Sequence, residues 1–377
     1  MSEWKLKDCC LSISDGDHLP PPKTDSGIPF ITISNIDSTN HIDFGNTLFV
    51  PIEYYEKLDD IRKAQPNDII YSVVGSFGKP VLIKDDRKFV FQRHIAILRP
   101  NSEIVDSRFL YYVMLSRDFY MQADTVAIGA AQRTISLSSL RNMKVELPPL
   151  PIQHRIATIL FRYDTLIENY QKQIKLLEEA AQRLYKEWFV ELRFPGHENT
   201  KIVDGLPEGW ERKKVGEIAP IKTGKKDANF GTTDGAYPFF TCSQEPIKAP
   251  SYSFDANAVI LAGNGDFNVK LYRGKFEAYQ RTYVLEPDDN ALLYLLYFCI
   301  SENMNKLASG ASGSTIKFLT KGMIDSLEVF VPSNDIVTRF NQYEESVQSE
   351  KERIQSQIRL LTEARDRLLP RLMGGDY

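Results

Sequence analysis

The sequence predicts an α+β fold in which two related, mixed α/β globular domains are joined by two long helices that form an antiparallel coiled coil, with an approximate two-fold axis between the halves. The first observation is an internal repeat: Asn67–Ile83 returns as Asn257–Arg273, and Gly129–Ile135 returns as Gly310–Ile316. The second is a long heptad-patterned segment after each copy. The period is about half the chain, far longer than the roughly 20–50 residues of a solenoid repeat, so we interpret it as a domain duplication.

The domain division follows from this order. The chain has 377 residues, enough for two domains of ordinary size and connecting helices. We place the first domain at residues 1–150, the first helix at 151–194, the second domain at 195–331 and the second helix at 332–377.

The first domain has strand-like and helical patterns in alternation. The expected strands are Ile28–Ile33, Asp68–Val74, Val81–Lys84, Phe89–Leu98 and Met143–Leu147, and the expected helices are Glu53–Lys63 and Arg108–Arg117.

The second domain repeats this framework. Its expected strands are Tyr237–Thr241, Val259–Ala262, Lys270–Tyr272, Tyr279–Leu285 and Ser326–Val331, with a helix at Leu292–Glu302. The triplet Phe91–Arg93 aligns with Tyr279–Arg281, which gives Arg93 and Arg281 matching strand positions. Leu19–Pro29 and Lys222–Tyr237 do not align, and divergent loops on a shared scaffold are typical of domains that recognise different targets.

Each long helix carries an apolar seam whose steps alternate between four and three residues, as in a coiled coil. The seam residues are Tyr163, Ile167, Tyr170, Ile174, Leu177 and Leu184 in the first helix and Ile354, Ile358, Leu361 and Leu368 in the second. The second seam is weaker, because Lys351 and Arg365 occupy two of its positions. Pro148–Pro151 sets the start of the first helix, and Pro370 with Gly374–Gly375 closes the second.

Connection lengths predict how the helices run. The first helix is about 58 Å long at 1.5 Å per residue, and the link from Phe194 to Gly209 spans at most about 54 Å. The second domain therefore lies most easily at the far end of the first helix, and the second helix runs back along it. The alternative is that each helix packs onto its own domain.

Composition excludes several classes of protein. The chain is 42% hydrophobic and 25% charged, as in globular proteins, and its longest strongly apolar run, Ala291–Ile300, is shorter than the about 20 residues of a membrane span. The first ten residues lack a signal-peptide core, so we expect a cytoplasmic protein with no membrane partner. The cysteines show no C-x-x-C spacing, and no metal site is expected. The net charge of −4 gives no general attraction to nucleic acid.

The sequence contains no convincing catalytic constellation. Gly263–Gly265 is read as a hairpin turn rather than a nucleotide loop, and the five histidines are scattered. Asp68 with Asp86–Lys88 loosely resembles a nuclease cluster, but the second copy has Ala258 and Gly274 at the places of Asp68 and Asp86. No phosphate loop and no amino-methyltransferase tetrapeptide is present. We expect a chain without catalytic residues.

Several short motifs, in this order on a duplicated framework, resemble one family. The chain resembles the specificity (S) subunit of type I restriction–modification enzymes over nearly its whole length. The matching segments are Asp68–Lys79, Gly129–Ile135, Leu147–Gln153, Tyr185–Phe189, Gly205–Trp210 and Leu368–Met373.

The resemblance implies two target-recognition domains that each read one half of a split, asymmetric site in double-stranded DNA. It implies that the paired helices act as a spacer and dock two methyltransferase (modification) subunits. Those subunits would supply S-adenosylmethionine chemistry to adenine, and no cofactor is expected on this chain. Whether restriction (motor–nuclease) subunits also join is left open, as are the bases read and the spacer length.

Polar and cationic loop residues are the candidates for DNA contact, because base edges and phosphates are read by such groups. They are Lys23, Thr24, Ser34, Asn35, Ser76, Arg93, Gln132, Arg133 and Thr134 in the first domain, and Lys222, Lys225, Lys226, Thr241, Ser243, Gln244, Asn264, Asn268, Arg281, Ser314 and Thr315 in the second. Each could instead be a solvated loop residue, and Arg93 and Arg281 could form structural ion pairs. Gln132–Arg133 aligns with Gly313–Ser314, so a contact there is expected in one domain only.

Other classes of function are open at this point. A free-standing DNA-binding protein would need no docking surface on its helices. A coiled-coil scaffold would bind proteins only and leave no DNA footprint. An enzyme is the last alternative, because no site supports it.

Overall fold

The computed structural model describes residues 2–16, 21–37, 39–130, 132–311, 313 and 317–375. The chain folds as two compact units, and each is described by itself. The first consists of residues 1–170 and 357–377, and the second of residues 171–356. Each long helix, α6 (Leu150–Tyr185) and α11 (Asn334–Met373), therefore contributes one end to each unit.

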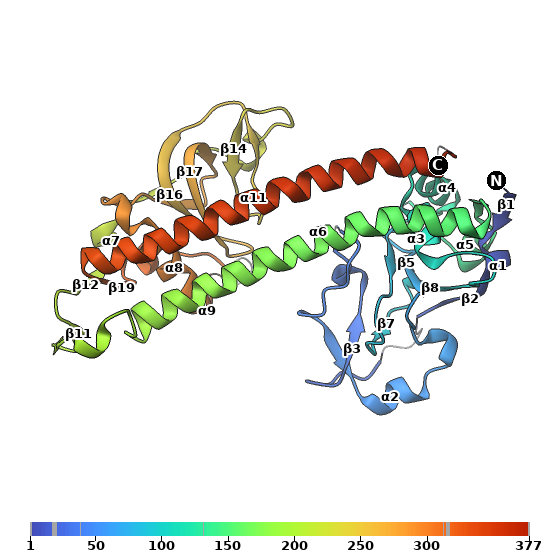
Figure 1. Ribbon diagram of the computed structural model, residues 1–377, viewed down its shortest axis with the longest axis horizontal. Helices are drawn as coiled ribbons and strands as arrows, with labels where there is room; N and C mark the ends of the chain where they lie inside the picture. The colour runs from blue at the N-terminus through green and yellow to red at the C-terminus, as the bar shows by residue number, and fades with distance from the viewer. Residues whose placement is uncertain are drawn as a thin grey trace. The chain divides into compact units, whose positions relative to one another are not determined.

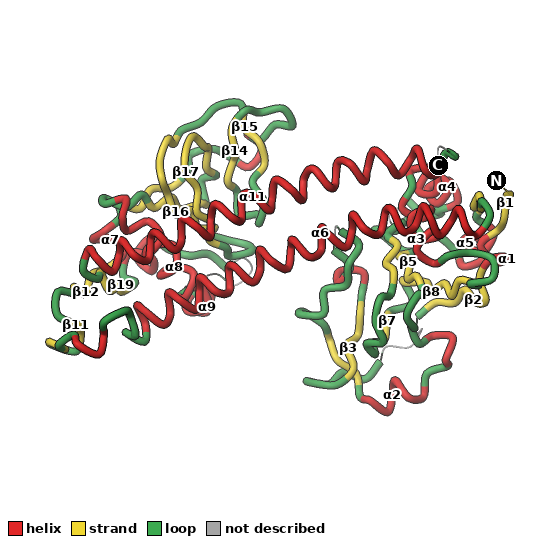
Figure 2. Tube along the Cα trace, viewed as in Figure 1, coloured by secondary structure: helices red, strands yellow, loops and turns green. Residues whose placement is uncertain are grey.

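The first unit is built on two small sheets and a two-stranded ribbon. The order β2-β8-β5-β6 gives an antiparallel sheet, β4-β3-β7 forms a second sheet in which β3 and β7 are parallel, and β1 pairs with β9. The strands are β1 (Ser2–Lys5), β2 (Cys10–Asp15), β3 (Ile28–Ile31), β4 (Leu48–Val50), β5 (Ile69–Ser72), β6 (Pro80–Leu82), β7 (Val90–Phe91), β8 (Ile95–Pro100) and β9 (Lys144–Leu147). Loops make up much of the region around β3 and β7 (Figure 2).

Helices of the first unit cover one face of the β2-β8-β5-β6 sheet. They are α1 (Leu6–Cys9), α3 (Ser107–Leu115), α4 (Arg117–Val126) and α5 (Leu137–Asn142), with α2 (Ile52–Lys57) and the 3₁₀ turns Ile33–Asn35 and Asp60–Arg62 in the loop region. The core beneath them joins Ile69, Leu98 and Phe109 to Ile156 of α6 and Leu372 of α11. The first and last described residues, Ser2 and Gly375, both belong to this unit (Figure 1).

The long helices run antiparallel in the first unit. Arg365 of α11 donates from Nη1 to Oδ1 of Asp164 on α6 at 2.7 Å, and the Tyr112 hydroxyl donates to Oδ2 of the same carboxylate at 2.5 Å. One or two turns away, Leu160 packs in the same core as Leu368. The charge at seam position 365 is thus matched by an acid on the facing helix.

Gln153, part of the Leu147–Gln153 motif, fixes the start of α6. It is 1% exposed, its Oε1 accepts from the backbone N–H of Asp106 at 2.9 Å, and its Nε2 donates to the carbonyl of Pro148 at 2.8 Å. Asp106 in turn caps α3 by accepting from the N–H groups of Arg108 and Phe109. A buried amide whose donors and acceptor are all satisfied specifies one local geometry.

The second unit repeats this topology. The ribbon β12-β19, the antiparallel run β13-β18-β16-β17, and β14 parallel to the end of β17 correspond to β1-β9, β2-β8-β5-β6 and β3-β7. Its strands are β12 (Glu211–Lys214), β13 (Ile221–Thr223), β14 (Tyr237–Phe240), β15 (Ile247–Ala249), β16 (Phe254–Ala262), β17 (Val269–Ala278), β18 (Thr282–Leu285) and β19 (Glu328–Val331), with the short β10 (Ile202–Val203) and β11 (Leu206–Pro207) before them.

The helices of the second unit correspond in order to those of the first. They are α7 (Val215–Ile218), α8 (Leu293–Glu302), α9 (Met304–Gly310) and α10 (Lys321–Asp325), with 3₁₀ turns at His197–Asn199, Ala228–Phe230 and Asn290–Leu292. A glycine marks the same close approach in both units. A Cβ on Gly16 would overlap the carbonyl oxygen of Phe91, and one on Gly224 would overlap that of Ala278.

Aromatic rings hold the helices of the second unit together. Phe340 of α11 is 1% exposed and packs against Tyr185, Trp188 and Phe189 of the first helix and Phe298 of α8, with ring centroids 4.8 to 6.3 Å apart. About three turns along α11, Lys351 pairs with Glu178 of α6 at 2.7 Å, so the helices are antiparallel here too. Both charges in the second predicted seam are therefore neutralised by α6.

One buried carboxyl of the second unit stands apart. Glu344 of α11 is 0% exposed, and among the described residues neither of its oxygens has a hydrogen-bond partner. The hydroxyl of Tyr294 on α8 and Oδ1 of Asn341 are likewise buried without a partner in the described part of the chain. Burial raises the pKa of Glu344 to about 7, against the opposing effect of Lys351.

The predicted fold class is confirmed, with two mixed α/β units that share two long helices. The helix ends differ in detail from the expectation. A π-helical turn at Lys186–Val190 ends the first helix before Phe194, and α11 continues through Pro370 to Met373. Pro370 has no N–H to donate to the carbonyl four residues before it, but its own carbonyl still accepts from the N–H of Gly374 at 2.9 Å, so the last turn continues beyond it.

Candidate nucleic-acid interface

Three separate segments of the second unit meet at Gly263, which follows β16. The N–H of Gly263 donates to the carbonyl of Arg281 at 2.8 Å, and its carbonyl accepts from the N–H of Leu319 at 2.8 Å. The turn between β17 and β18, the hairpin turn between β16 and β17, and the segment before α10 are therefore held side by side. The predicted hairpin turn at Gly263–Gly265 is confirmed, with Gly265 in the left-handed region at φ 70°.

The loop after β14 joins the same cluster. The Cys242 thiol donates to Oδ1 of Asn264 at 2.8 Å, and Nε2 of Gln244 donates to Oδ2 of Asp266 at 2.6 Å. Asn268 is 9% exposed and donates to the carbonyls of Cys242 and Asp266. Of the candidate residues, Thr241, Ser243, Gln244, Asn264, Asn268 and Arg281 thus lie together, and Asn268 serves to hold the loops in place.

The lysines in and after β13 lie beside this cluster. The N–H of Gln280 donates to the carbonyl of Lys226 at 2.9 Å, which places the lysine segment beside the turn that carries Arg281. Lys222 pairs with Glu286 at 2.9 Å, and the Lys226 ammonium lies 4.4 Å from the ring centre of Phe230. Lys225 is exposed, and no carboxylate of the described residues pairs with it.

The first unit has the same arrangement around Val73. The N–H of Val73 donates to the carbonyl of His94 at 2.9 Å, and its carbonyl accepts from the N–H of Ile135 at 2.8 Å. This brings together Ser76 in the β5–β6 hairpin, Arg93 in the β7–β8 turn, and Gln132, Arg133 and Thr134 in the loop before α5. Ser76, Arg93 and Gln132 are exposed.

Arg133 is engaged within its own unit. Its guanidinium forms an ion pair with Asp124 of α4, donates to the carbonyls of Asp124 and Ala127, and lies 5.4 Å from the ring centre of Phe77. A base contact from Arg133 would have to be made beside these interactions or in place of them. This pairing could not be expected from the sequence, because Asp124 lies outside the predicted elements, in the helix α4 that was not predicted.

Arg133→Ala and Lys225→Ala are expected to differ in their effect on stability. Arg133→Ala should lower the free energy of unfolding by about 1 kcal/mol, since it removes a half-exposed ion pair and a ring contact, whereas Lys225→Ala should leave it unchanged. Both should weaken DNA binding. Urea unfolding of the two variants, with binding measured in parallel, checks this, and equal stability of the two would contradict the structural role of Arg133.

The remaining candidates of the first domain lie around the β4-β3-β7 sheet. Thr24 pairs its backbone with Phe49, and Lys23, Thr24 and Ser34 are exposed. Asn35 is 7% exposed, accepts from the N–H of Thr32 at 2.9 Å and donates to the carbonyl of Asn46 at 3.0 Å, so it shapes its loop. Ser314 and Thr315 lie outside the described residues.

Two alignments from the sequence are wrong in register. The N–H of Ile95 bonds the carbonyl of Gln92, as the N–H of Thr282 bonds that of Tyr279. His94 therefore corresponds to Arg281, and Arg93 corresponds to Gln280. Both arginines lie in turns rather than in strands, and among the described residues neither forms an ion pair.

The loop before the last short helix is also shifted. Thr134 bridges to Val74 in the first unit, and Phe318 bridges to Asn264 in the second. Thr134 thus corresponds to Phe318 and Arg133 to Lys317, so both loops carry a basic residue at this place. The alignment of Gln132–Arg133 with Gly313–Ser314 is therefore wrong, and it gives no reason to expect a basic contact in one domain only. Lys317 and Phe318 were not among the candidates, because the sequence alignment paired Gly129 with Gly310 and so placed the two loops out of register.

The predicted seam residues of α6 and α11 are all buried or half-buried. Ile167 is 8% exposed and Ile354 1%, whereas Leu166, Leu176 and Leu360, which lie off the seam, are 45%, 58% and 60% exposed. The exposed leucines leave apolar surface along both helices.

No metal site is found in the described ranges. Within them, no three His, Cys, Asp or Glu side chains gather in a way that could hold a metal ion. Asp68, the carboxylate of the loosely nuclease-like cluster, is 2% exposed and pairs with Arg99 at 2.9 Å. No helix in the described part of the chain is both long and apolar enough to cross a membrane.

Comparison with known proteins gives a consistent result. The family described as "Type I restriction modification DNA specificity domain" matches residues 3–179 and 207–360. The specificity subunit of the type I restriction enzyme EcoDI from Escherichia coli is 39% identical over 175 residues, which cover 45% of this chain and 39% of that protein. The MjaIX specificity subunit from Methanocaldococcus jannaschii is 25% identical over 72% of this chain and 69% of its own length.

A solved structure shares the fold. The crystal structure of the type I restriction–modification S subunit from M. genitalium is matched with a TM-score of 0.58 and 18% identity, over 98% of this chain and 95% of that one. The match to the Escherichia coli relative spans well under half of that protein's length.

Proposed function

Because the chain belongs to the family of type I restriction–modification DNA specificity domains, we propose that it is the DNA-specificity subunit of such a complex and reads a bipartite, asymmetric site in double-stranded DNA. Residues 1–150 and 195–331 would be its two target-recognition domains. The segments 151–194 and 332–377 would form the spacer. The curated relatives are named as specificity subunits, so catalysis is assigned to partner subunits.

One observation carries the proposal. The two units share a hydrogen-bonded framework around Val73 and Gly263, while the side chains that project from it differ in size and charge. A shared scaffold with different polar loops is what two unequal half-sites require, because base edges are read by side chains on positioned elements.

The long helices support the proposal that the chain also binds partner subunits. Their seams are buried, and the exposed Leu166, Leu176 and Leu360 offer apolar surface for protein partners. We assign this surface to two methyltransferase subunits, which would bind S-adenosylmethionine, and to restriction subunits where the complex has them. DNA as the target implies that the complex works in the cytoplasm.

Deleting the gene for this chain is expected to remove methylated adenines from one bipartite motif in the source genome, and reintroducing it should restore them. The physical reason is that the methyltransferase subunits would have no sequence reader without it. Long-read sequencing that detects methyladenine in the three strains gives the answer. A methylation pattern that is the same in all three would refute the proposed function.

Purification distinguishes the rival functions. A specificity subunit should copurify with a methyltransferase-like chain and should bind its site tightly only in that complex. Tight specific binding by the isolated chain would favour a free-standing DNA-binding protein. Absence of any footprint in the complex would favour a protein-only scaffold.

A further inference from the structure

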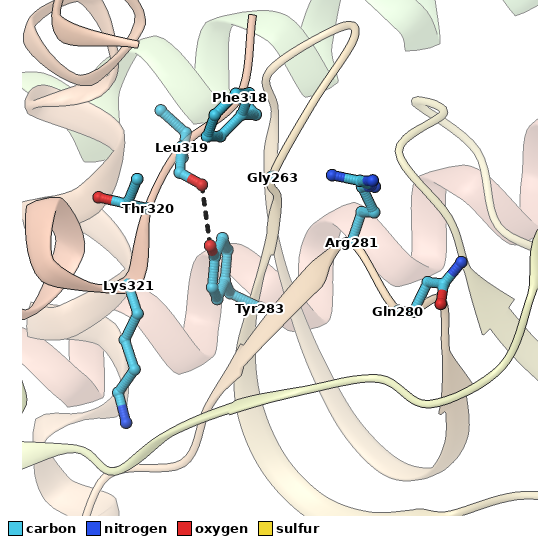
Figure 3. Close-up of a pocket in the computed structure, with 8 residues that line it drawn as sticks. All are labelled: Gly263, Gln280, Arg281, Tyr283, Phe318, Leu319, Thr320 and Lys321. Carbon is cyan, nitrogen blue, oxygen red and sulfur yellow. Dashed lines mark hydrogen bonds between the residues drawn. The ribbon is translucent and has the colours of Figure 1, made fainter. Parts of the chain in front are cut away.

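A pocket of about 370 Å³ opens beside Gly263 in the second unit. Phe318, Leu319 and Lys321 lie on one side of Gly263, and Gln280 and Arg281 lie on the other (Figure 3). The hydroxyl of Tyr283 on β18 donates to the carbonyl of Leu319 at 2.8 Å, and this hydrogen bond holds the two segments together within the pocket. A Cβ at position 263 would lie 2.4 Å or so from the carbonyl oxygen of Arg281, so only glycine permits this close approach.

The chemistry of the pocket is that of an anion site with an aromatic edge. Arg281 and Lys321 are exposed, Phe318 is 38% exposed, and Gln280 and Thr320 add an amide and a hydroxyl. Of the described residues that line the pocket, none is acidic, and no carboxylate among the described residues pairs with either cation. Two unpaired cations beside an exposed ring suit a nucleotide, which has both a phosphate and an apolar face.

We propose, on the basis of the proposed function, that this pocket is the base-reading centre of the second domain, with Arg281 contacting a guanine in the major groove and Lys321 contacting a backbone phosphate. Arginine to guanine is the commonest specific pairing, because the guanidinium presents two parallel donors to O6 and N7. Lysine is a point charge that holds phosphate without regard to sequence. Phe318 gives apolar contact beside the base.

The first unit carries different chemistry on the same framework. By the hydrogen bonds of Val73 and Gly263, His94 corresponds to Arg281, Thr134 to Phe318, and Ser136 to Thr320. The next residue is Leu137 in the first unit and Lys321 in the second. Burial lowers the pKa of His94 and the neighbouring Arg93 lowers it further, so the imidazole is neutral near pH 7. A neutral imidazole with a hydroxyl makes a different set of base contacts from a guanidinium with a phenyl ring.

Different side chains at these corresponding positions therefore give the two domains different contacts with bases. The scaffold holds them at equivalent places, and only their side chains differ. Exchange of a residue between corresponding positions should then change one half of the recognised site and leave the other half unaltered.

The test is an exchange of Arg281 and His94 in the complete complex with its methyltransferase subunits. Arg281→His should reduce discrimination at one base position of the second half-site by roughly 5- to 150-fold, and His94→Arg should change the first half-site only. Lys321→Ala should weaken binding to all duplexes alike and make binding less steeply dependent on salt. Lys306→Ala, at an exposed residue of α9 that does not line the pocket, is the charge-matched control.

The readouts are the methylated motif in cells and the affinity of the purified complex for duplexes that vary at each base of the motif. If Arg281→His weakens all sequences equally, Arg281 contacts phosphate and its base-reading assignment is overturned. An unchanged motif in both exchange variants also overturns the inference, provided that thermal unfolding shows them folded. Failure of the wild-type complex to bind or methylate any specific motif would instead reject the proposed function itself.

Discussion

Phe340→Ala is expected to destabilise the second unit by about 3–5 kcal/mol, the usual cost of removing a fully buried phenyl ring. The ring lies in the only place where rings from the first helix, α8 and α11 are seen to pack on one another among the described residues. Its loss leaves a cavity between three helices that cannot close without moving one of them. The lost stability should therefore weaken the packing of α11 against the rest of the second unit.

Tryptophan fluorescence during urea unfolding measures this, because Trp188 and Trp210 belong to the second unit and Trp4 to the first. Tyr343→Ala is the matched control on the same helix. Tyr343 is 39% exposed, so its truncation should change the free energy of unfolding by no more than about 0.5 kcal/mol. Equal effects of the two substitutions would show that Phe340 does not hold the helices together.

Glu344→Gln is expected to stabilise the second unit at pH 8 and to have little effect at pH 4. Burial raises the pKa of Glu344 from 4.5 to about 7, so the folded state binds the proton more tightly than the unfolded state does. Stability is therefore lost as the pH rises from about 4.5 to about 7, and the loss is complete above pH 7. The wild-type penalty at pH 8 is about 3 kcal/mol, and glutamine, which carries no charge, should remove it.

The groups that face Glu344 set this expectation. They are Lys351 and Gln348 on α11, both of which lower its pKa, and Tyr294 and Tyr297 on α8; Lys351 also pairs with Glu178 of α6. Glu345→Gln is the control of opposite sign. The Arg273 guanidinium bonds Glu345 and lowers its pKa, so this variant should lose stability at neutral pH. The idea fails if wild type and Glu344→Gln show parallel stability curves between pH 4 and pH 8.

The long helices were predictable because their signal is regular. Apolar residues such as Ile167 and Ile354 recur at coiled-coil spacing over many turns, and the structure buries both. The partners of the seam charges were not predictable. Asp164 and Arg365 lie far apart in the sequence, and only the antiparallel packing in the first unit shows that one neutralises the other.

Some short elements were predicted and others were missed: β9 matches the expected strand Met143–Leu147, whereas its partner β1 was not expected. The ribbon β1-β9 and the turn of helix α1 depend on pairing between the first residues of the domain and Lys144–Leu147, which no local pattern shows. The expected strand Phe89–Leu98 is broken by the turn at Gln92–His94, since β7 joins one sheet and β8 another. A continuous apolar run cannot reveal such a change of sheet.

Contact between the candidate residues and DNA stays a prediction, but the structure shows which of them lie together. Loop chemistry pointed to Arg281, Asn264 and Gln244, which do converge. Loop chemistry could not distinguish these three residues from Asn35 and Asn268, which are buried within their own loops. The sequence does not show whether an asparagine side chain is buried. The repeats were aligned on identical letters, whereas backbone hydrogen bonds set the true correspondence between the domains. Placement of the two units at opposite ends of the helices stays a prediction.

The first unit is assembled from two stretches of chain, residues 1–170 and 357–377, with the whole of the second unit synthesised between them. On the ribosome, Leu160 and Asp164 emerge long before Leu368, Leu372 and Arg365 exist to cover them. Until the last turns of α11 have been synthesised, the early part of the first unit exposes apolar side chains such as Leu160 to solvent. Premature termination near residue 356 would thus damage the part of the protein that was made first.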